Sequence, residues 1–594
     1  MNPNWNLDKL YTGFDDPLFL VDHQAMPTAM QALIDFCQTA FEDVTDDHTG
    51  EAVPKLERFI NLYNDFSRYY NLIMYASLII EVNNEHAPAL KIINQIEDIL
   101  TDMTQVDTLL KLYLATLSDL EAAISASPLL TAHAFMLREA KKEASHILTP
   151  AEEMVFAKMK LTGSNGWASM YGQVVSTLGV PINLNGETQH LTLSQVRNLA
   201  EDKEQYIRKT AYYAELAAYP QIEKAIASAL NNIKGEAIAT AKLRGYENVL
   251  DMTLSTSFMD HETLEALMAA MEETMPMWRD YFTHKAHLLG HNTGKLPWYD
   301  LFSPVGTVDM QFTKEEAAAF VSQNFAAFGE DLGNFVNHAF DNDWVDWYPA
   351  QGKSGGAFCM NLHSIQESRV LMNFSGSFGD VLTLAHEFGH AYHGEALKDV
   401  TFLNSSYSMP IAEVASTFCE TLVINAALKT ATPAEQLVIM ENNLQGSSQV
   451  IVDIYSRYLF ESRLIKLREA GSLSVDELKD IMGEAQRAAY GDALSSDHPY
   501  MWLCKGHYYG VDNNFYNYPY AYGLLFAKGL YSLYQKEGAS FAARYRDMLT
   551  ATGANNLYDV GQIMGINVRD KGFWREALAV CEAEIKAFVT LPAH

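Results

Sequence analysis

"AHEFGHAYHGE", residues 385–395, decides how the rest of the chain is interpreted. It holds two histidines four residues apart, with a glutamate directly after the first. On a helix, His386 and His390 share one face with Cβ atoms about 5–6 Å apart, so both imidazoles can reach one ion at about 2.0–2.1 Å. Glu387, one step around the helix, can reach a water on that ion. This is the geometry of the HExxH metallopeptidase motif. The alternative is an ordinary helix whose histidines lie at the surface or in the core.

A catalytic zinc also needs a third protein ligand and an open position for water. The longer metzincin pattern would supply a third histidine, but His393 and Ala396 stand at its glycine and histidine positions, which excludes that class. Segment 409–422, "MPIAEVASTFCETL", offers Glu413 on an amphipathic helical stretch instead. We therefore expect Glu413 as the third ligand. Glu420 lies seven residues on along the same face, so we expect it to orient a histidine; an exposed charge is the alternative.

His393 is a tempting further ligand because it belongs to the same segment. It lies seven residues beyond His386, a rise of about 10 Å along a helix. One ion is not easily shared over that distance, so we expect His393 to be structural.

Composition narrows the class of protein. The chain has 594 residues, 48% of them hydrophobic, and a formal net charge of -32. Such a polyanion is repelled by nucleic acid and by anionic membranes. The five cysteines are scattered without a CxxC pair, which argues against disulfides and against a cysteine–zinc site. The start shows no secretory signal and no apolar run is long enough to cross a bilayer, so we expect a cytoplasmic protein without nucleic-acid or membrane partners.

Most of the chain has the pattern of amphipathic helices with clear start signals. "TPAE" at Thr149 and Thr432 combines a capping threonine, a proline suited to the first turn, and a glutamate that closes a capping box. "TKEE" at Thr313 and "SVDE" at Ser474 likewise predict a capping hydroxyl and a glutamate that closes a capping box.

Strand signals are few. Segment 181–193 alternates around Asn185-Gly186, which predicts a hairpin. Ser194 then resembles a helix cap, and we expect a domain boundary near it. "RVLMNF", residues 369–374, is a second candidate strand, directly before the histidine helix.

The segment "KGHYYGVDNNFYNYPYAYG", residues 505–523, is dense in aromatic side chains. Such density usually marks a core or a stacking surface. Zinc peptidases, however, need donors for the oxyanion that forms on the scissile carbonyl, and a histidine N–H with a tyrosine hydroxyl would serve.

Taken together, these motifs resemble the oligoendopeptidase F family, a bacterial branch of the thimet-oligopeptidase-like zinc peptidases. The resemblance covers nearly the whole chain. The segments that carry it are "WNLDKLY" (5–11), "LPWYDLFSP" (296–304), "GKSGGAFC" (352–359), "HEFGHAYHG" (386–394), "PIAEVAST" (410–417) and 507–523.

The resemblance implies a mainly α fold of two lobes enclosing a deep substrate channel, with a small β-sheet next to the HExxH helix. It implies an N-terminal helical domain at 1–195 and a catalytic zinc metallopeptidase domain at 196–594. Strand 369–374 would align the substrate backbone by adding it to the sheet.

It also implies roles for individual residues. One zinc per chain would be held by the two histidines of the motif and Glu413, with Glu387 as general base. His507 matches the family's transition-state histidine and Tyr518 best matches its oxyanion tyrosine, with Tyr516 close by. Which tyrosine besides Tyr518 contacts the oxyanion is left open.

We therefore expect a zinc-dependent endopeptidase that hydrolyses internal bonds of short unfolded peptides. Zinc would lower the pKa of its water towards about 7, and Glu387 would carry the proton from the water to the leaving amine. One alternative is an exopeptidase on the same scaffold. Another is a peptide-binding protein with a structural zinc, which usually has four protein ligands; no fourth ligand is evident in the sequence.

Overall fold

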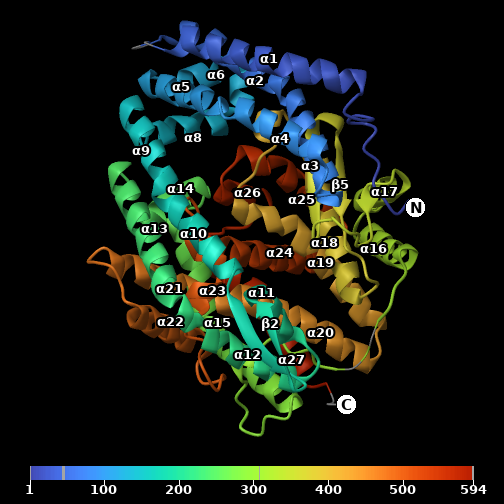
Figure 1. Cartoon of the computed structure of the whole chain (residues 1–594). Helices are drawn as coiled ribbons and strands as arrows, with labels where there is room; N and C mark the ends of the chain where they lie inside the picture. Colours follow the sequence, from blue (N-terminus) through green and yellow to red (C-terminus); the bar gives the residue numbers. More distant parts are fainter. Residues whose placement is uncertain (1, 43, 45–46, 307, 309, 592–594) are drawn as a thin grey trace. The chain divides into compact units, whose positions relative to one another are not determined.

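The computed structural model describes residues 2–42, 44, 47–306, 308 and 310–591. Most of these residues lie in helices, and five short strands complete the fold (Figure 1). The expectation of a mainly α fold is confirmed. Contacts divide the chain into two compact units. The first comprises Met1–Ile147, Met310–Val423 and Tyr534–Ile566, and the second comprises Leu148–Asp309, Ile424–Leu533 and Asn567–His594. A boundary at residue 195 and a channel enclosed by two lobes stay predictions.

The first unit begins with a layer of helices around an apolar core, drawn in blue in Figure 1. The main helices and strands of this unit are α1 (Pro17–Phe41), α2 (Thr49–Phe66), α3 (Tyr70–Val82), α4 (Ala87–Leu100), α5 (Met103–Thr116), α8 (Ala134–Ala144), α16 (Lys314–Phe328), α17 (Glu330–Asp341), β3 (Val345–Asp346), β4 (Phe358–Leu362), β5 (Glu367–Leu371), α18 (Phe378–Ala396), α25 (Ser540–Ala551) and α26 (Leu557–Ile563). Helix α19 (Met409–Thr430) starts in this unit.

A three-stranded sheet in the order β3-β5-β4 lies against α18. The predicted strand at 369–374 corresponds to β5, which begins earlier and ends at Leu371. β5 pairs with β3 on one side and with β4 on the other. Val370 and Leu371 of β5 pair on both sides, so the expectation that 369–374 aligns a substrate does not hold for these residues; β3 and β4 are the strands at the edges. A small sheet next to the HExxH helix is confirmed.

Helix α18 carries the histidine motif, and its start follows from local sequence. Ser377 is the N-cap, and its hydroxyl accepts a hydrogen bond from the Asp380 N–H. The Asp380 carboxylate in turn accepts from the backbone N–H groups of Ser375, Gly376 and Ser377. This capping box satisfies donors that a helix start leaves unpaired, and its negative charge suits the helix dipole.

The second unit contains the predicted hairpin. β1 (Gly179–Leu184) pairs with β2 (Glu187–Thr192) around Asn185 and Gly186, whose φ angles of 55° and 86° fit a tight two-residue turn. The following helix α11 (Leu193–Asn198) is capped by Thr192, so the expectation of a cap at Ser194 is wrong by two residues. The four capping boxes predicted elsewhere, at Thr149, Thr313, Thr432 and Ser474, are all present.

Longer helices make up the rest of the second unit. They are α9 (Pro150–Thr162), α10 (Ser164–Ser176), α12 (Gln205–Ala218), α13 (Glu223–Leu243), α14 (Val249–Thr256), α15 (His261–Leu288), α20 (Pro433–Ser448), α21 (Ile454–Arg468), α22 (Val475–Tyr490) and α27 (Lys571–Phe588). Helix α24 (Tyr518–Glu537) starts in this unit. Between α20 and α21 the chain stays helical through a π-helix, η7 (Gln449–Asp453).

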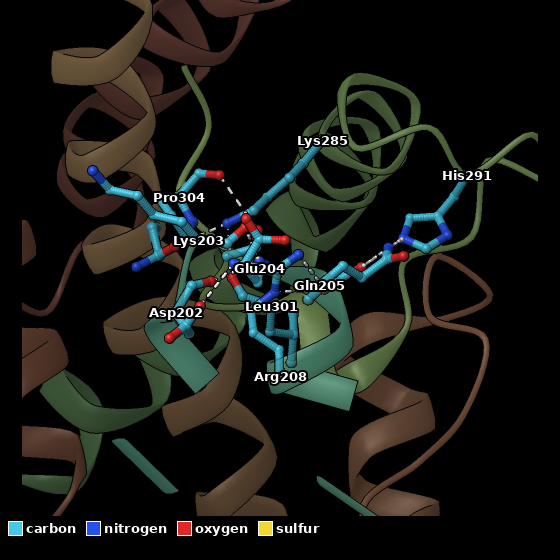
Figure 2. Close-up of polar contacts among 12 residues, drawn as sticks. Asp202, Lys203, Glu204, Gln205, Arg208, Lys285, His291, Leu301 and Pro304 are labelled. Atoms are coloured by element: carbon cyan, nitrogen blue, oxygen red, sulfur yellow. Dashed lines mark hydrogen bonds and ion pairs between the residues drawn. The ribbon is translucent and has the colours of Figure 1, made fainter. Parts of the chain in front are cut away.

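A buried polar network explains the "LPWYDLFSP" segment (Figure 2). Asp300 is fully buried and accepts hydrogen bonds from Arg208, at 2.8 Å, and from Gln205, at 2.9 Å. Arg208 also donates to the backbone carbonyls of Asp202 and Lys203. A buried carboxylate is tolerated only when paired and hydrogen-bonded. Asp300 thereby fixes this loop to the start of α12.

Candidate metal centre

Three ligand atoms from α18 and α19 converge in the first unit. His386 Nε2 lies 3.2 Å from His390 Nε2 and 3.2 Å from Glu413 Oε2, and the last two atoms are 3.5 Å apart. Ligands placed tetrahedrally at about 2.0–2.1 Å from zinc are about 3.3–3.4 Å from each other. The three residues therefore fit a single ion with a fourth position left open. Among the described residues this is the cluster with metal-ligand geometry.

A glycine inside the motif allows the two helices to meet. A Cβ atom on Gly389 would come within 2.5 Å of the Ala415 carbonyl oxygen and of Ser416 Cα. Real Cβ atoms do not approach backbone this closely, so residue 389 has to be glycine for α19 to sit where it does. This close approach brings Glu413, two residues before Ala415, to the histidines.

Neighbouring groups fix the direction of each ligand. The Nδ1–H of His386 donates to the Glu420 carboxylate, and His390 hydrogen bonds the backbone of Ala412. Ser416 donates to Glu413 Oε2 at 3.0 Å. With the other ring nitrogens occupied in this way, both Nε2 atoms face the centre of the triad. The expected contact between Glu420 and a histidine is present.

The charges at the triad are arranged around one positive centre. Burial alone would lower the pKa of His386, but hydrogen bonds to Glu413 and Glu420 outweigh it and raise the pKa to about 10. Burial and the neighbouring His386 charge lower the pKa of His390 to about 4. Burial would raise the pKa of Glu413, but the two histidines outweigh it and lower the pKa to about 2. The lowered pKa values keep His390 neutral and Glu413 ionised, which are the protonation states that metal ligands need.

Glu387 lies one residue along α18 and is 5% exposed. Burial, followed by the nearby carboxylates Glu413 and Glu420, raises its pKa to about 7 against the lowering effect of His386. Its Oε2 atom has no hydrogen-bond partner among the described residues. A buried carboxyl with a free oxygen and a pKa near neutrality is suited to accept and return a proton.

His393 is not part of the metal cluster. It is fully buried, its Nε2 hydrogen bonds Thr552 Oγ1 at 2.8 Å, and its ring stacks on Tyr407 with centroids 3.9 Å apart. The expectation of a structural role for His393 agrees with these contacts.

The remaining predicted site residues lie in the second unit. His507 stacks on Tyr516 with ring centroids 5.6 Å apart, and Tyr520 meets the His507 ring edge-on. Tyr518 is 1% exposed and its hydroxyl donates to Ser257 Oγ at 2.9 Å. The structure therefore pairs His507 with Tyr516, while the Tyr518 hydroxyl is engaged elsewhere.

Sequence reasoning missed two contributors to the centre. Ser416 supports Glu413, and a serine three residues after a candidate ligand on a helix was a usable signal. Asn361 on β4 donates to the His390 carbonyl oxygen at 3.3 Å and so joins the edge strand to α18. No local pattern in the sequence indicated this contact, because the two residues are 29 positions apart.

Helix α19 has one further property. Its length and apolar composition would suffice to cross a membrane, but 61% of its most apolar window is buried inside the fold. It is also the helix that carries Glu413, so its apolar character serves packing around the metal centre.

Family models and known relatives match most of the chain. A model described as Peptidase family M3 matches residues 198–580, and one described as Oligopeptidase F matches residues 116–178. The oligopeptidase PepF of Bacillus subtilis is 26% identical over 440 residues, which span 73% of this chain and 65% of that protein. The group B oligopeptidase PepB of Streptococcus agalactiae is 25% identical over 464 residues, 75% of each chain.

Solved structures share the fold. Oligoendopeptidase-F from Enterococcus faecium superposes with a TM-score of 0.69 at 17% identity, covering 96% of this chain and 99% of that one. A structure from Chlamydophila abortus reaches a TM-score of 0.84 at 19% identity and covers 100% and 99%. The resemblance seen in the sequence motifs is thereby confirmed.

Proposed function

Because the chain belongs to peptidase family M3, we propose that it is a zinc-dependent endopeptidase that hydrolyses internal bonds of short unfolded peptides. The observation that supports this most directly is the triad of His386, His390 and Glu413, with spacings of 3.2–3.5 Å between ligand atoms. These residues would hold one zinc ion. When bound, the ion supplies the Lewis-acid charge that activates water and polarises the scissile carbonyl.

Glu387 is the proposed general base and acid. Its unpartnered Oε2 would accept the proton of the attacking water, and the same oxygen would then deliver it to the leaving amide nitrogen. The raised pKa of about 7 supports both halves of this cycle, because the carboxyl can hold and release a proton near neutral pH.

The edge strand β4 is the proposed guide for the peptide backbone. Its inner side pairs with β5 over Phe358–Leu362, and Asn361 joins it to α18 next to His390. An extended peptide added to the outer side would be held by main-chain hydrogen bonds. Such binding suits unfolded substrates of varied sequence, since the backbone is the group recognised.

The donors to the oxyanion are proposed from the resemblance in sequence alone. We retain His507, Tyr516 and Tyr518, whose roles are supported by the resemblance in sequence. The ring stacking favours Tyr516 as the partner of His507, and the Tyr518 hydroxyl donates to Ser257. A cytoplasmic location remains a prediction.

The test is cleavage of a medium-length peptide blocked at both ends, by wild type and by Glu387→Gln, with zinc content measured on both. We expect internal cleavage by wild type alone, with about one zinc per chain in both proteins. Glu413→Ala is the matched variant that should lose zinc.

Other outcomes select the alternatives. Turnover retained by Glu387→Gln would remove Glu387 from the proton transfers. Cleavage of unblocked peptides alone would indicate an exopeptidase. Bound zinc without cleavage of either kind would indicate a peptide-binding protein.

A further inference from the structure

The tyrosine-rich segment before α24 contains a strained residue. Phe515 has a φ of 52°, in the left-handed region that bulky residues rarely adopt. Such a conformation is strained and persists only where the surroundings hold it. Tyr516 follows directly, and its ring stacks on His507. Contacts on either side of Phe515 and Tyr516 hold this segment in place.

One anchor lies on the N-terminal side of Phe515. Lys234 on α13 donates to Glu461 Oε1 on α21 at 2.6 Å and to Asn514 Oδ1 at 2.9 Å. All three side chains are buried, with exposures of 0%, 1% and 1%. We call this chain of contacts the Asn514 anchor.

A second anchor lies on the C-terminal side of Tyr516. Arg457 on α21 donates to Asn517 Oδ1 at 2.8 Å, and its other terminal nitrogen forms an ion pair with Asp453. These side chains are also buried, at 9%, 3% and 6% exposure. We call this chain the Asn517 anchor. Both anchors have the same order of groups: carboxylate, cation, asparagine.

Helix α21 and the end of the π-helix supply groups to both anchors. Asp453 is the last residue of η7, and Arg457 and Glu461 come after it at four-residue intervals, so all three share one face of the helix. A π-helical turn adds one residue to a turn and rotates the helix beyond it by about 100° relative to an unbroken α-helix. The neighbouring Tyr458, one step around α21, has its ring 5.7 Å from the Phe515 ring, centroid to centroid.

We propose that the Asn514 and Asn517 anchors form a positioning device that fixes Tyr516 beside His507 for peptide hydrolysis. The proposal rests on the proposed function, in which these two side chains act on the substrate. The anchoring residues themselves do not touch the substrate in this account.

The chemistry of the anchors supports a role in positioning Tyr516 rather than a role only in stabilising the fold. Burying charges is costly, and buried ion pairs can often be replaced by apolar side chains without loss of stability. Two separate buried ion pairs that both end on asparagines within one short segment specify its geometry far more narrowly than apolar packing would. The anchors also influence His507 itself. Burial, and then the positive charges of Arg457 and Lys505, lower the pKa of its imidazole.

The experiment uses the zinc-loaded full chain and four variants of two residues: Asn517→Leu and Asn514→Leu remove each acceptor, and Asn517→Asp and Asn514→Asp restore one. Asn231→Leu is the matched control. It is also buried in the same unit, at 5% exposure, but its amide bonds the backbone of Ala227 and Leu473. Four quantities are measured: kcat and KM on a blocked peptide, the zinc content, and the ring-current shift of the His507 side-chain protons by NMR of histidine-labelled protein.

We expect each leucine variant to lose about ten- to a hundredfold in kcat, since a displacement of about 1 Å can cost 10²-fold, with KM and zinc content unchanged. Both should lose the Tyr516 ring-current shift, whereas Asn231→Leu keeps it. The aspartate variants should recover most of kcat and the shift.

The inference is overturned if the leucine variants retain the shift and a kcat like that of Asn231→Leu. The NMR measurement does not depend on turnover. If wild type cleaves no peptide, the proposed function fails, while the presence or loss of the shift still decides whether the anchors hold Tyr516 on His507.

Discussion

Gly389 lies so close to the backbone of Ala415 that a methyl group on residue 389 would come within 2.5 Å of the Ala415 carbonyl oxygen. This contact joins the helix that carries both histidines to the helix that carries Glu413. The geometry of the metal centre therefore depends on residue 389 being glycine, which has no side chain to keep the two helices apart.

Gly389→Ala should move α19 away from α18 and weaken zinc binding. We expect zinc affinity to fall at least about tenfold, with a parallel loss of peptide cleavage, because a shifted Glu413 no longer meets the ligand spacing. A competition titration with a chelating dye measures the affinity. Gly379→Ala, on the same helix, places its Cβ at an ordinary 3.5 Å from its neighbour and is the control. Equal affinities for the two variants would contradict the argument.

Glu420→Gln tests the carboxylate behind His386. Its amide oxygen can still accept from Nδ1–H, but the negative charge that makes the imidazole a better ligand is lost. Groups in this position typically change metal affinity about 10–100-fold, and we expect a loss in that range. Glu395→Gln, on α18 with Lys398 as its partner, should bind zinc like wild type. If Glu420→Gln does so too, Glu420 contributes only a surface charge.

Acid stability should depend on Glu215. Burial alone would raise its pKa, but Arg197 and His498 outweigh it and lower the pKa to about 2, from 4.5. Because the folded-state pKa is the lower one, this group stabilises the fold fully above pH 4.5, and the effect, about 3 kcal/mol, is lost as the pH falls towards 2. Glu215→Gln should flatten the fall of unfolding free energy below pH 4.5, measured with urea at several pH values. The exposed Glu582→Gln should leave the slope unchanged.

The ion pair between Arg208 and Asp300 should matter for stability. Arg208→Met leaves Asp300 buried without its main partner, so we expect a loss of about 3–5 kcal/mol in the free energy of unfolding. Arg463→Met removes an exposed pair with Glu484 and should change it by less than about 1 kcal/mol. Urea unfolding of both variants compares them. Similar unfolding midpoints for the two variants would mean that the buried network of Asp300 in Figure 2 does not stabilise the fold.

Features set by neighbouring residues were predictable from sequence. Capping boxes, the hairpin at Asn185-Gly186 and the shared face of His386 and His390 follow from turn chemistry and helix periodicity. The error at Ser194 is of the same local kind, since Thr192 offers an equally good capping hydroxyl with Gln195 to complete the box.

Features set by distant pairing were not predictable in the same way. Strand order decides that β4, and not β5, lies at a sheet edge, and neither the sequence FCMNL of β4 nor ESRVL of β5 indicates that order. The choice between Tyr516 and Tyr518 depends on Ser257, which is 261 residues away from Tyr518. Within a segment of alternating tyrosines, only the packed structure shows that Tyr518 bonds Ser257 and that Tyr516 stacks on His507.

The first unit is assembled from three stretches of chain, and this has a consequence during synthesis. Helix α25 packs on α18, and Thr552 bonds His393, yet both are made well over a hundred residues after the histidine motif. Because a ribosome adds residues in order, His386 and His390 emerge long before the surface that supports their helix. A fragment ending at Val423 would contain every metal ligand and still lack the packing that holds them in place, so we expect zinc to be retained only once nearly the whole polypeptide has been released.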